Sequence, residues 1–314
     1  MADLPSQALR LASAAFAGYA GVTLPTAGKI NWYLERPRMR RDLSMGAVNA
    51  EGVLVSSVYI TLERVQMAGA LVPVALVDTV MTDPAYRRLG LARRTLAAAL
   101  EASRAAGAVV ALLFTVPASA PCHFYESLGF SIAEQIRVLA RGQASTGSEE
   151  ARLATPADTA NLIAFWNHVY GGHNGYVPLD EPLWRWRREQ RPLELPSETW
   201  FSPREGPIVA AVNYCRARVI GSAAESLVLT DLAWLPGSAG AAQALALLRG
   251  ALRAEARLLA PVRDAGLQAV AVAAGCVEIG REAAMLAPLA PEGERLLGEE
   301  LTPWYALPES VIGV

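Results

Sequence analysis

The stretch of sequence that decides the fold is Leu76-Val-Asp-Thr-Val-Met-Thr-Asp-Pro-Ala-Tyr-Arg-Arg-Leu-Gly-Leu-Ala-Arg93. Its beginning belongs to an apolar run over 71–81, which is typical of a strand. Its end opens a segment over 89–106 whose small and apolar residues recur on one helical stripe until Gly107. The stretch therefore predicts a strand, a short loop and an amphipathic helix in direct succession.

The loop in this stretch has the composition of an anion site. A helix that starts directly after a strand leaves its first backbone N–H groups without partners, and the helix dipole favours an anion there. Gly90 permits a positive φ and a close approach by a ligand, and Ala92 keeps the first turn small. Arg87, Arg88 and Arg93 add positive charge. We interpret the loop as a phosphate site, and the alternative is a helix start with solvated arginines.

Short apolar runs separated by turns surround this stretch. Before it, the sequence predicts a helix and an antiparallel meander, over 7–18, 43–50, 53–65 and 71–81. After it, the continuous apolar run AVVALLF at 108–114 predicts a buried strand, parallel to its predecessor across the helix. A short helix at 121–128 and a strand over 130–141 complete the unit. We therefore expect an α/β fold of the α+β kind, with a mixed sheet.

The second half of the chain repeats this outline faintly. A small polar stretch over 142–150 predicts a linker between two domains, 1–141 and 151–314. In the second domain the place of the phosphate loop is taken by 235–242, which has glycines but no arginine ahead of them, so we expect a degenerate copy. The predicted elements are strands at 152–155, 207–213, 218–224, 226–234 and 267–273, and helices at 158–170 and 240–259.

A second motif, Cys122-His-Phe-Tyr-Glu-Ser-Leu-Gly-Phe130, follows the first after a helix and a buried strand. Together the two motifs resemble the pyrophosphate loop and the cofactor-closing helix of the GNAT superfamily of acetyltransferases, over about residues 5–141. The faint repeat is similar to the architecture of tandem GNAT proteins. The segment Arg64–Pro73 is similar to the enhanced-intracellular-survival (Eis) type among them.

The resemblance implies acetyl-CoA as the acyl donor. It implies that the strands before and after the helix splay apart, and that the backbone of Val80, Met81 and Thr82 pairs with the pantetheine arm as an added strand does. A backbone N–H near Met81 then faces the thioester oxygen. The pyrophosphate is expected on the loop formed by Arg87, Arg88, Leu89, Gly90, Leu91, Ala92 and Arg93.

Two side chains are candidates for the proton transfers. Tyr125 matches the family position that protonates the leaving thiolate, and the alternative is a tyrosine that packs the short helix onto the sheet. Asp78 is the candidate base, directly or through water, because an acid in an apolar strand must be paired, hydrated or functional. A cap or a salt bridge within the sheet is the equal alternative for Asp78.

Composition excludes several classes of protein. The chain has 314 residues and a net charge of −2, so nothing electrostatic draws it to nucleic acid. No run of about 18 apolar residues predicts a membrane span. The three cysteines are scattered without metal-type spacing, which indicates a reduced, cytoplasmic protein without a metal site. Lys29 is the only lysine.

One aromatic cluster has two interpretations. Trp184-Arg-Trp-Arg-Arg188 mixes tryptophans with cations, and such a segment either stacks nucleobases or anchors a helix through its tryptophans. With the other aromatic residues of the second half, it either walls a substrate pocket or packs a core. Those residues are Phe165, Trp166, Tyr170, Tyr176 and Trp200.

These observations together predict an enzyme, an acetyl-CoA-dependent N-acetyltransferase (EC 2.3.1.-). It would transfer an acetyl group to a primary amine of a small molecule by direct attack in a ternary complex, with no covalent enzyme intermediate. A homo-oligomer is compatible with the sequence. One alternative is a mycothiol-synthase-like acyltransferase, although that enzyme keeps its intact motif in the C-terminal unit. The other is a non-catalytic sensor that binds acyl-CoA.

Overall fold

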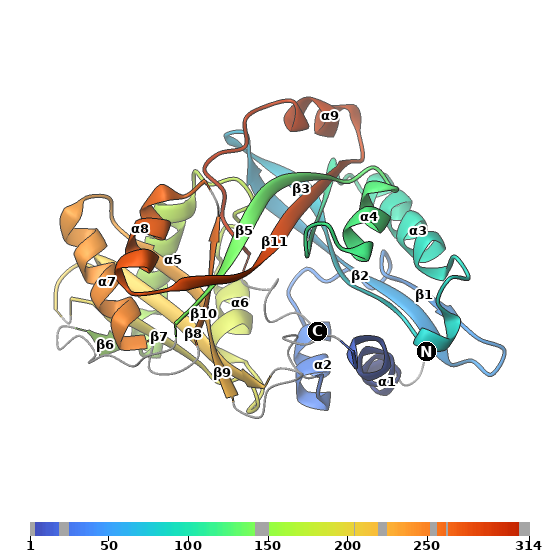
Figure 1. The fold of residues 1–314 in the computed structure, drawn as a ribbon, viewed down its shortest axis with the longest axis horizontal. Coiled ribbons are helices and arrows are strands. Elements are labelled where there is room, and N and C mark those ends of the chain that lie inside the picture. Colours follow the sequence, from blue (N-terminus) through green and yellow to red (C-terminus); the bar gives the residue numbers. More distant parts are fainter. Residues whose placement is uncertain are drawn as a thin grey trace.

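The computed structural model describes residues 4–18, 25–141, 151–203, 205–218, 225–251, 256–261 and 263–307. Within these residues the strands form one mixed sheet of eleven strands, in the order β1-β2-β3-β4-β11-β5-β10-β9-β8-β7-β6 (Figure 1). The predicted mixed α/β fold is therefore confirmed. The predicted linker over 142–150 lies outside the described residues.

The first half follows the sequence prediction closely. Ala68 and Gly69 both have positive φ and form the tight turn between the two long strands of the meander. The elements of this half are α1 (Leu4–Phe16), α2 (Ala27–Leu34), β1 (Met45–Val48), β2 (Leu54–Met67), β3 (Ala70–Thr82), η1 (Pro84–Tyr86), α3 (Leu91–Ala105), β4 (Val110–Thr115), α4 (Ala120–Glu126) and β5 (Ser131–Arg141).

The second half begins with β6 (Arg152–Leu153), η2 (Pro156–Asp158), α5 (Thr159–Tyr170), α6 (Glu181–Trp184) and the π-helical turn η3 (Arg185–Glu189). The strands β7 (Ser197–Ser202), β8 (Ala210–Arg218) and β9 (Glu225–Trp234) come next, followed by α7 (Ser238–Ala251) and β10 (Ala256–Pro261). The half ends with α8 (Ala265–Ala273), β11 (Val277–Pro288) and α9 (Pro291–Leu297).

Two predictions for the second half are wrong. The run at 267–273 is not a strand but lies in α8, whose first turn is capped by the Asp264 side chain. An apolar run of this length fits a helix and a strand equally well, and the buried strand here is β10. The helix expected over 240–259 is also too long, because α7 ends at Ala251 and the residues from Ala256 onward form β10. The prediction missed β7 and β11, and most of the strand expected at 218–224 lies outside the described residues.

The last strand of each half pairs with a strand of the other half. β11 pairs antiparallel with β4, and β5 pairs antiparallel with β10. β5 and β11 also pair with each other, and in Figure 1 they cross the middle of the molecule between two groups of helices. The sheet is therefore continuous through the predicted domain boundary.

The two parallel strand pairs diverge after a short contact. β3 and β4 pair only through Val74–Val110, Ala75–Ala111 and Leu76–Leu112, so the last six residues of β3 leave β4. β9 and β10 likewise pair only up to Leu229–Leu258. The predicted splay between the strands is therefore present, once in each half of the sheet.

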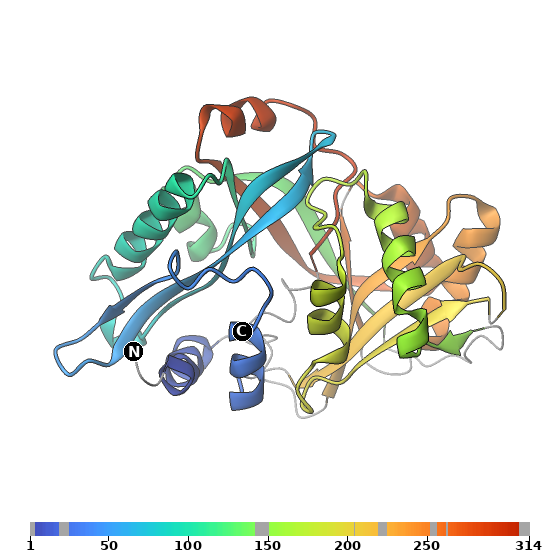
Figure 2. The ribbon, with the colours of Figure 1, turned by 180° about the vertical axis from the view of Figure 1, so that it is seen from behind.

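Helices cover both faces of the first half of the sheet, as Figures 1 and 2 show. On one face, Leu96 and Ala99 of α3 pack against Val58 and Ile60. On the other face, α1 and α2 pack in the largest core cluster, which continues into the second half. There the rings of Trp32 in α2 and Trp186 in η3 stack at 4.3 Å, and each indole Nε1 donates to the other residue's carbonyl.

Candidate functional site

The loop between β3 and α3 has the backbone of an anion site. Arg88 has a φ of 64° and Gly90 a φ of 73°, so residues of opposite handedness alternate and turn successive N–H groups to one side. α3 begins at Leu91 without a side-chain cap, and the amides of Leu91, Ala92 and Arg93 have no partner in the described part of the chain. A Cβ at Gly90 would meet no atom within 4 Å. The loop is thus open to a ligand.

The arginines of the loop divide into two kinds. Arg87 donates to the carbonyls of Ala15, at 2.9 Å, and Thr82, at 3.4 Å, and so ties the loop to α1. Arg93 donates to the Ser127 hydroxyl at 2.6 Å and ties α3 to α4. Arg88 is exposed, and its side chain makes no hydrogen bond or ion pair with another described residue. Among these three, Arg88 is the one whose charge is left for a ligand.

The end of β3 presents backbone groups to the splay. The Asp83 amide donates to Val55 at 2.9 Å, and the Met81 carbonyl accepts from Ser56 Oγ at 2.9 Å, so both face β2. Because backbone groups alternate along a strand, those of Val80 and Thr82 face the side that β4 has left. Thr79, with a φ of 50°, forms the bulge that shifts the register here.

Asp78 lies at the entrance of the splay, two residues beyond the last β3–β4 pair. Its side chain keeps 24% of its surface exposed, and its Oδ2 lies 3.7 Å from Arg36 Nη1. The Thr79 hydroxyl donates to Oδ1 at 3.2 Å. Burial raises the pKa of the neighbouring Tyr33, and the negative charge of Asp78 raises it further. Asp78 is thus loosely held and reachable from solvent.

Tyr125 approaches from the opposite face of the sheet. It lies on α4, half-buried, with ring centroids 5.2 Å from Phe124 and 5.9 Å from Phe130. α4 packs in the cluster that contains Leu96, whereas Asp78 contacts residues of α2 and its C-terminal end. The two predicted proton-transfer residues are therefore placed on either side of the sheet that opens at the splay.

A row of buried polar residues was missed by the sequence analysis. Ser57, Tyr59, Thr61 and Glu63 alternate along β2 on the face of the sheet that α1 and α2 cover, and none is more than 6% exposed. Each has a buried side-chain oxygen without a hydrogen-bond partner among the described residues. The signal was the strict polar–apolar alternation over 57–63, which is typical of a strand with one face in water. Here that polar face is enclosed.

The sole lysine lies in the first turn of α2. Lys29 of α2 is fully buried, and burial lowers its pKa to about 7, while Cys215 and Asp78 act in the opposite direction. A buried amine of this kind is mostly neutral above neutral pH.

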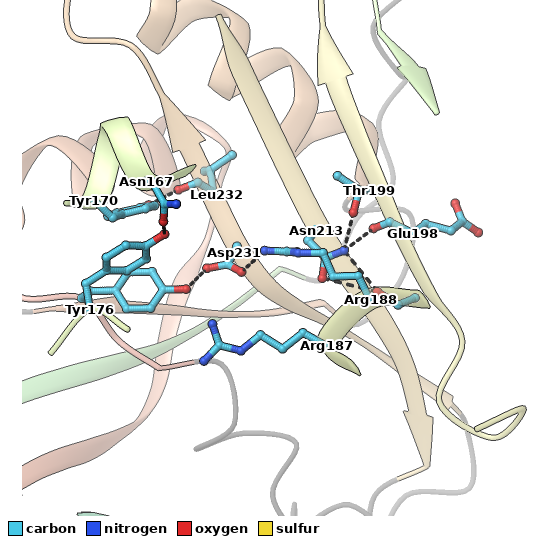
Figure 3. Close-up of polar contacts among 12 residues, drawn as sticks. Asn167, Tyr170, Tyr176, Arg187, Arg188, Glu198, Thr199, Asn213, Asp231 and Leu232 are labelled. Carbon is cyan, nitrogen blue, oxygen red and sulfur yellow. Dashed lines mark hydrogen bonds and ion pairs between the residues drawn. The ribbon is translucent and has the colours of Figure 1, made fainter. Parts of the chain in front are cut away.

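The splay in the second half is filled by side chains. Asp231 accepts from Arg188 at 2.7 Å and from the Tyr305 hydroxyl, and burial raises the pKa of this carboxyl. The Tyr170 hydroxyl donates to the carbonyl of Leu232 on β9 (Figure 3). Above them, α7 starts after Gly237, which has a φ of 112°, but 235–242 contains no arginine. The second half therefore repeats the strand divergence and the glycine turn before a helix. It lacks the space between the strands and the arginines that the first half has.

The aromatic cluster is a core. Trp166, Tyr176, Trp184 and Trp186 are at most 2% exposed and belong to the largest apolar cluster. Nucleobase stacking on Trp184 and Trp186 is therefore not available.

Among the residues that the structure describes, no group of histidine, cysteine and acidic side chains could hold a metal ion. None of the helices in this part of the chain is long and apolar enough to cross a membrane.

Comparison with known proteins places this site in a family. Residues 3–133 match the model of the acetyltransferase (GNAT) domain. No curated protein matches the sequence.

Three solved structures share the fold. A GNAT N-acetyltransferase from Anabaena variabilis is 14% identical, with a TM-score of 0.65 over 91% of this chain and 70% of its own. A probable N-acyltransferase from Enterococcus faecalis is 17% identical, with a TM-score of 0.63 over the same shares. The N-myristoyltransferase of Saccharomyces cerevisiae, solved with bound myristoyl-CoA, is 10% identical, with a TM-score of 0.69 over 90% of this chain and 75% of its own.

The family model covers both the loop at Arg88–Arg93 and the helix that carries Tyr125. The chain therefore contains a GNAT acetyltransferase domain, in residues 3–133.

Proposed function

We propose that the protein is an N-acetyltransferase that transfers the acetyl group of acetyl-CoA to a primary amine of a small molecule. The observation that carries the proposal is the coincidence of two features. An open anion loop with free amides stands directly above a splay that exposes unpaired backbone. A donor with a pyrophosphate and an amide-bearing arm fits both features at once.

In the proposed complex the pyrophosphate accepts from the amides of 88–93, and Arg88 adds its charge. The pantetheine amides pair with Val80 and Thr82, whose backbone groups face the splay. Arg87 and Arg93 act indirectly, since their bonds to Ala15, Thr82 and Ser127 hold the loop in place. The arrangement requires no movement of the sheet.

The reaction then proceeds by direct attack. The neutral amine bonds to the thioester carbonyl carbon, and a strand amide at the end of β3 stabilises the oxyanion. The carbon–sulfur bond breaks and leaves the amide product and the CoA thiolate. Asp78, directly or through water, takes the proton from the amine, and Tyr125 gives a proton to the thiolate. No metal takes part in this scheme.

We further propose a single active site, in a tandem arrangement of domains 1–141 and 151–314 whose second unit is a scaffold. Support comes from the second splay, where the Tyr170 hydroxyl takes up the backbone carbonyl of Leu232 and Asp231 is buried between Arg188 and Tyr305. The intact loop in the N-terminal half also argues against a mycothiol-synthase-like role. The three free, scattered cysteines support a cytoplasmic location.

Calorimetry with acetyl-CoA, CoA and ATP, followed by turnover with a panel of amines, tests the proposal. A CoA site binds the first two ligands and not ATP. Binding of acetyl-CoA without acetylation of any amine would favour the non-catalytic sensor. No binding of acetyl-CoA would end the proposal.

A further inference from the structure

A buried arginine, Arg36, has side-chain nitrogens that lack hydrogen-bond partners among the described residues. Arg36 follows α2, and its side chain is 1% exposed. Nη1 points to Asp78 at 3.7 Å, whereas Nε and Nη2 are buried without a hydrogen-bond partner among the described residues. The guanidinium also lies over the Trp186 ring, 5.2 Å from its centroid, which fixes its plane.

The two unpartnered nitrogens of Arg36, Nε and Nη2, form one edge of the guanidinium. Nε–H and Nη2–H are parallel donors, and this fork matches the two oxygens of a carboxylate. Leaving charged donors unpaired inside a protein is costly, so a buried fork of this kind indicates a ligand. Two further buried groups without a hydrogen-bond partner among the described residues, on Tyr33 and Glu63, lie near enough for the charge of Arg36 to counter the rise in their pKa that burial causes.

The neighbouring charges restrict what the ligand can be. Asp78 and Glu63 both lie near Arg36, so a doubly charged phosphate would meet two carboxyl groups. Glu63 accepts from Arg38 at 2.6 Å, which partly offsets its charge. A single carboxylate is compatible with this balance, and an ammonium beside Asp78 adds the opposite charge.

We propose that the buried polar face of β2, together with Arg36 and Asp78, is the acceptor subsite, and that the Nε–Nη2 edge of Arg36 binds the carboxylate of a free α-amino acid whose amine faces Asp78. Since Arg36 and Asp78 are only 3.7 Å apart, the amine and carboxylate of the ligand must be separated by few bonds. The proposal rests on the proposed function for the reaction, but not for the binding.

The test compares amino acids with the amines that lack only the carboxylate. The pairs are phenylalanine and phenethylamine, histidine and histamine, and leucine and isoamylamine. Calorimetry on the full chain saturated with CoA measures binding, and thiol release from acetyl-CoA measures turnover. Losing a buried, charge-assisted pair of bonds should weaken binding about 10–100-fold. At least one amino acid should therefore bind, and its amine should bind at least about tenfold more weakly.

Arg36→Lys keeps the charge and removes the fork, and it should abolish the preference for the amino acid while leaving the affinity for CoA unchanged. Arg191→Lys is the matched control, because Arg191 lies over Trp32 at 4.7 Å as Arg36 lies over Trp186. It should keep the preference. Melting curves of both variants exclude unfolding as the cause.

The outcomes separate the two proposals. Binding of an amino acid without its acetylation would contradict the proposed reaction and keep the subsite. Acetylation of amines without any preference for a carboxylate would overturn the subsite and keep the reaction. If none of the twenty amino acids binds to wild type, or if Arg36→Lys keeps the preference, the subsite is wrong.

Discussion

The two places where parallel strands of the sheet diverge share the same backbone arrangement. They differ in how tightly the aspartate at each place is buried and hydrogen-bonded. Asp78 and Asp231 each stand two residues beyond the last parallel pair of their strand, Leu76–Leu112 and Leu229–Leu258. Asp231 is 5% exposed and holds two partners at hydrogen-bonding distance or closer. Asp78 keeps a looser contact of 3.7 Å to its arginine and part of its surface in solvent.

The difference lies in a few side chains. Tyr170 and Tyr305 supply hydroxyls to the unpaired carbonyl and carboxylate of the second splay, and Arg188 completes its charge (Figure 3). In the first splay, Asp78 accepts from the Thr79 hydroxyl at 3.2 Å and lies 3.7 Å from Arg36. A diverging strand pair is therefore a core when side chains satisfy its polar groups and a ligand site when they do not.

The largest expected effect compares the two loops. Gly90→Glu should weaken acetyl-CoA binding by about 100-fold or more, because a carboxylate would stand where the pyrophosphate binds. Gly237→Glu imposes the same kind of backbone strain at the start of α7 and should leave the affinity unchanged. Calorimetry on both variants measures this. Equal losses would mean that the two loops do not differ in function.

The next effect compares one tyrosine at the first splay, Tyr125, with one at the second, Tyr170. Tyr125→Phe should lower kcat about 100-fold, at the lower end of general acid catalysis, with little change in the KM for acetyl-CoA. Tyr170→Phe removes the bond to Leu232 and should cost about 1–2 kcal/mol of unfolding free energy without lowering kcat. A Tyr125→Phe enzyme with full kcat would reduce this residue to packing.

Exchange of each aspartate for asparagine sharpens the comparison further. Asp231→Asn leaves the buried charge of Arg188 uncompensated and should lower the unfolding free energy by about 3 kcal/mol. Asp78→Asn should cost less than about 1 kcal/mol, because its ion pair is long and partly exposed, and should reduce kcat instead. Urea unfolding and acetylation assays measure the two effects. Similar stability losses would contradict the assignment of Asp231 to structure and Asp78 to chemistry.

The last effect is a gradual dependence of stability on pH. The folded-state pKa of Lys29 is lowered to about 7, so the unfolded chain binds more protons between pH 7 and the ordinary lysine pKa. Stability should therefore rise with pH in this window, by at most about 1.4 kcal/mol per pH unit from this one group. Lys29→Met should be more stable at pH 7 and lose this slope. An unchanged slope would place the titration elsewhere.

The sequence alone was sufficient for the turn at 87–90 and for the strand and helix on either side of it. Gly90, the arginines and the amphipathic pattern over 89–106 act within one strand, one turn and one helix, so their structure depends on neighbours in the chain. The parallel crossover was predictable for the same reason, since a strand, a helix and a strand in succession have one favoured handedness.

Only the tertiary structure decided the rest. The exchange of β5 and β11 depends on which strands meet in space, and no local pattern specifies it. The alternation over 57–63 is the same for a face in water and for a face under α2, and the helix that covers it decides between them. Likewise Asp78 and Asp231 are both acids in apolar strands. Their different surroundings follow from residues far along the chain, Arg36 and Tyr305, because burial and hydrogen bonding are set by three-dimensional neighbours and not by sequence position.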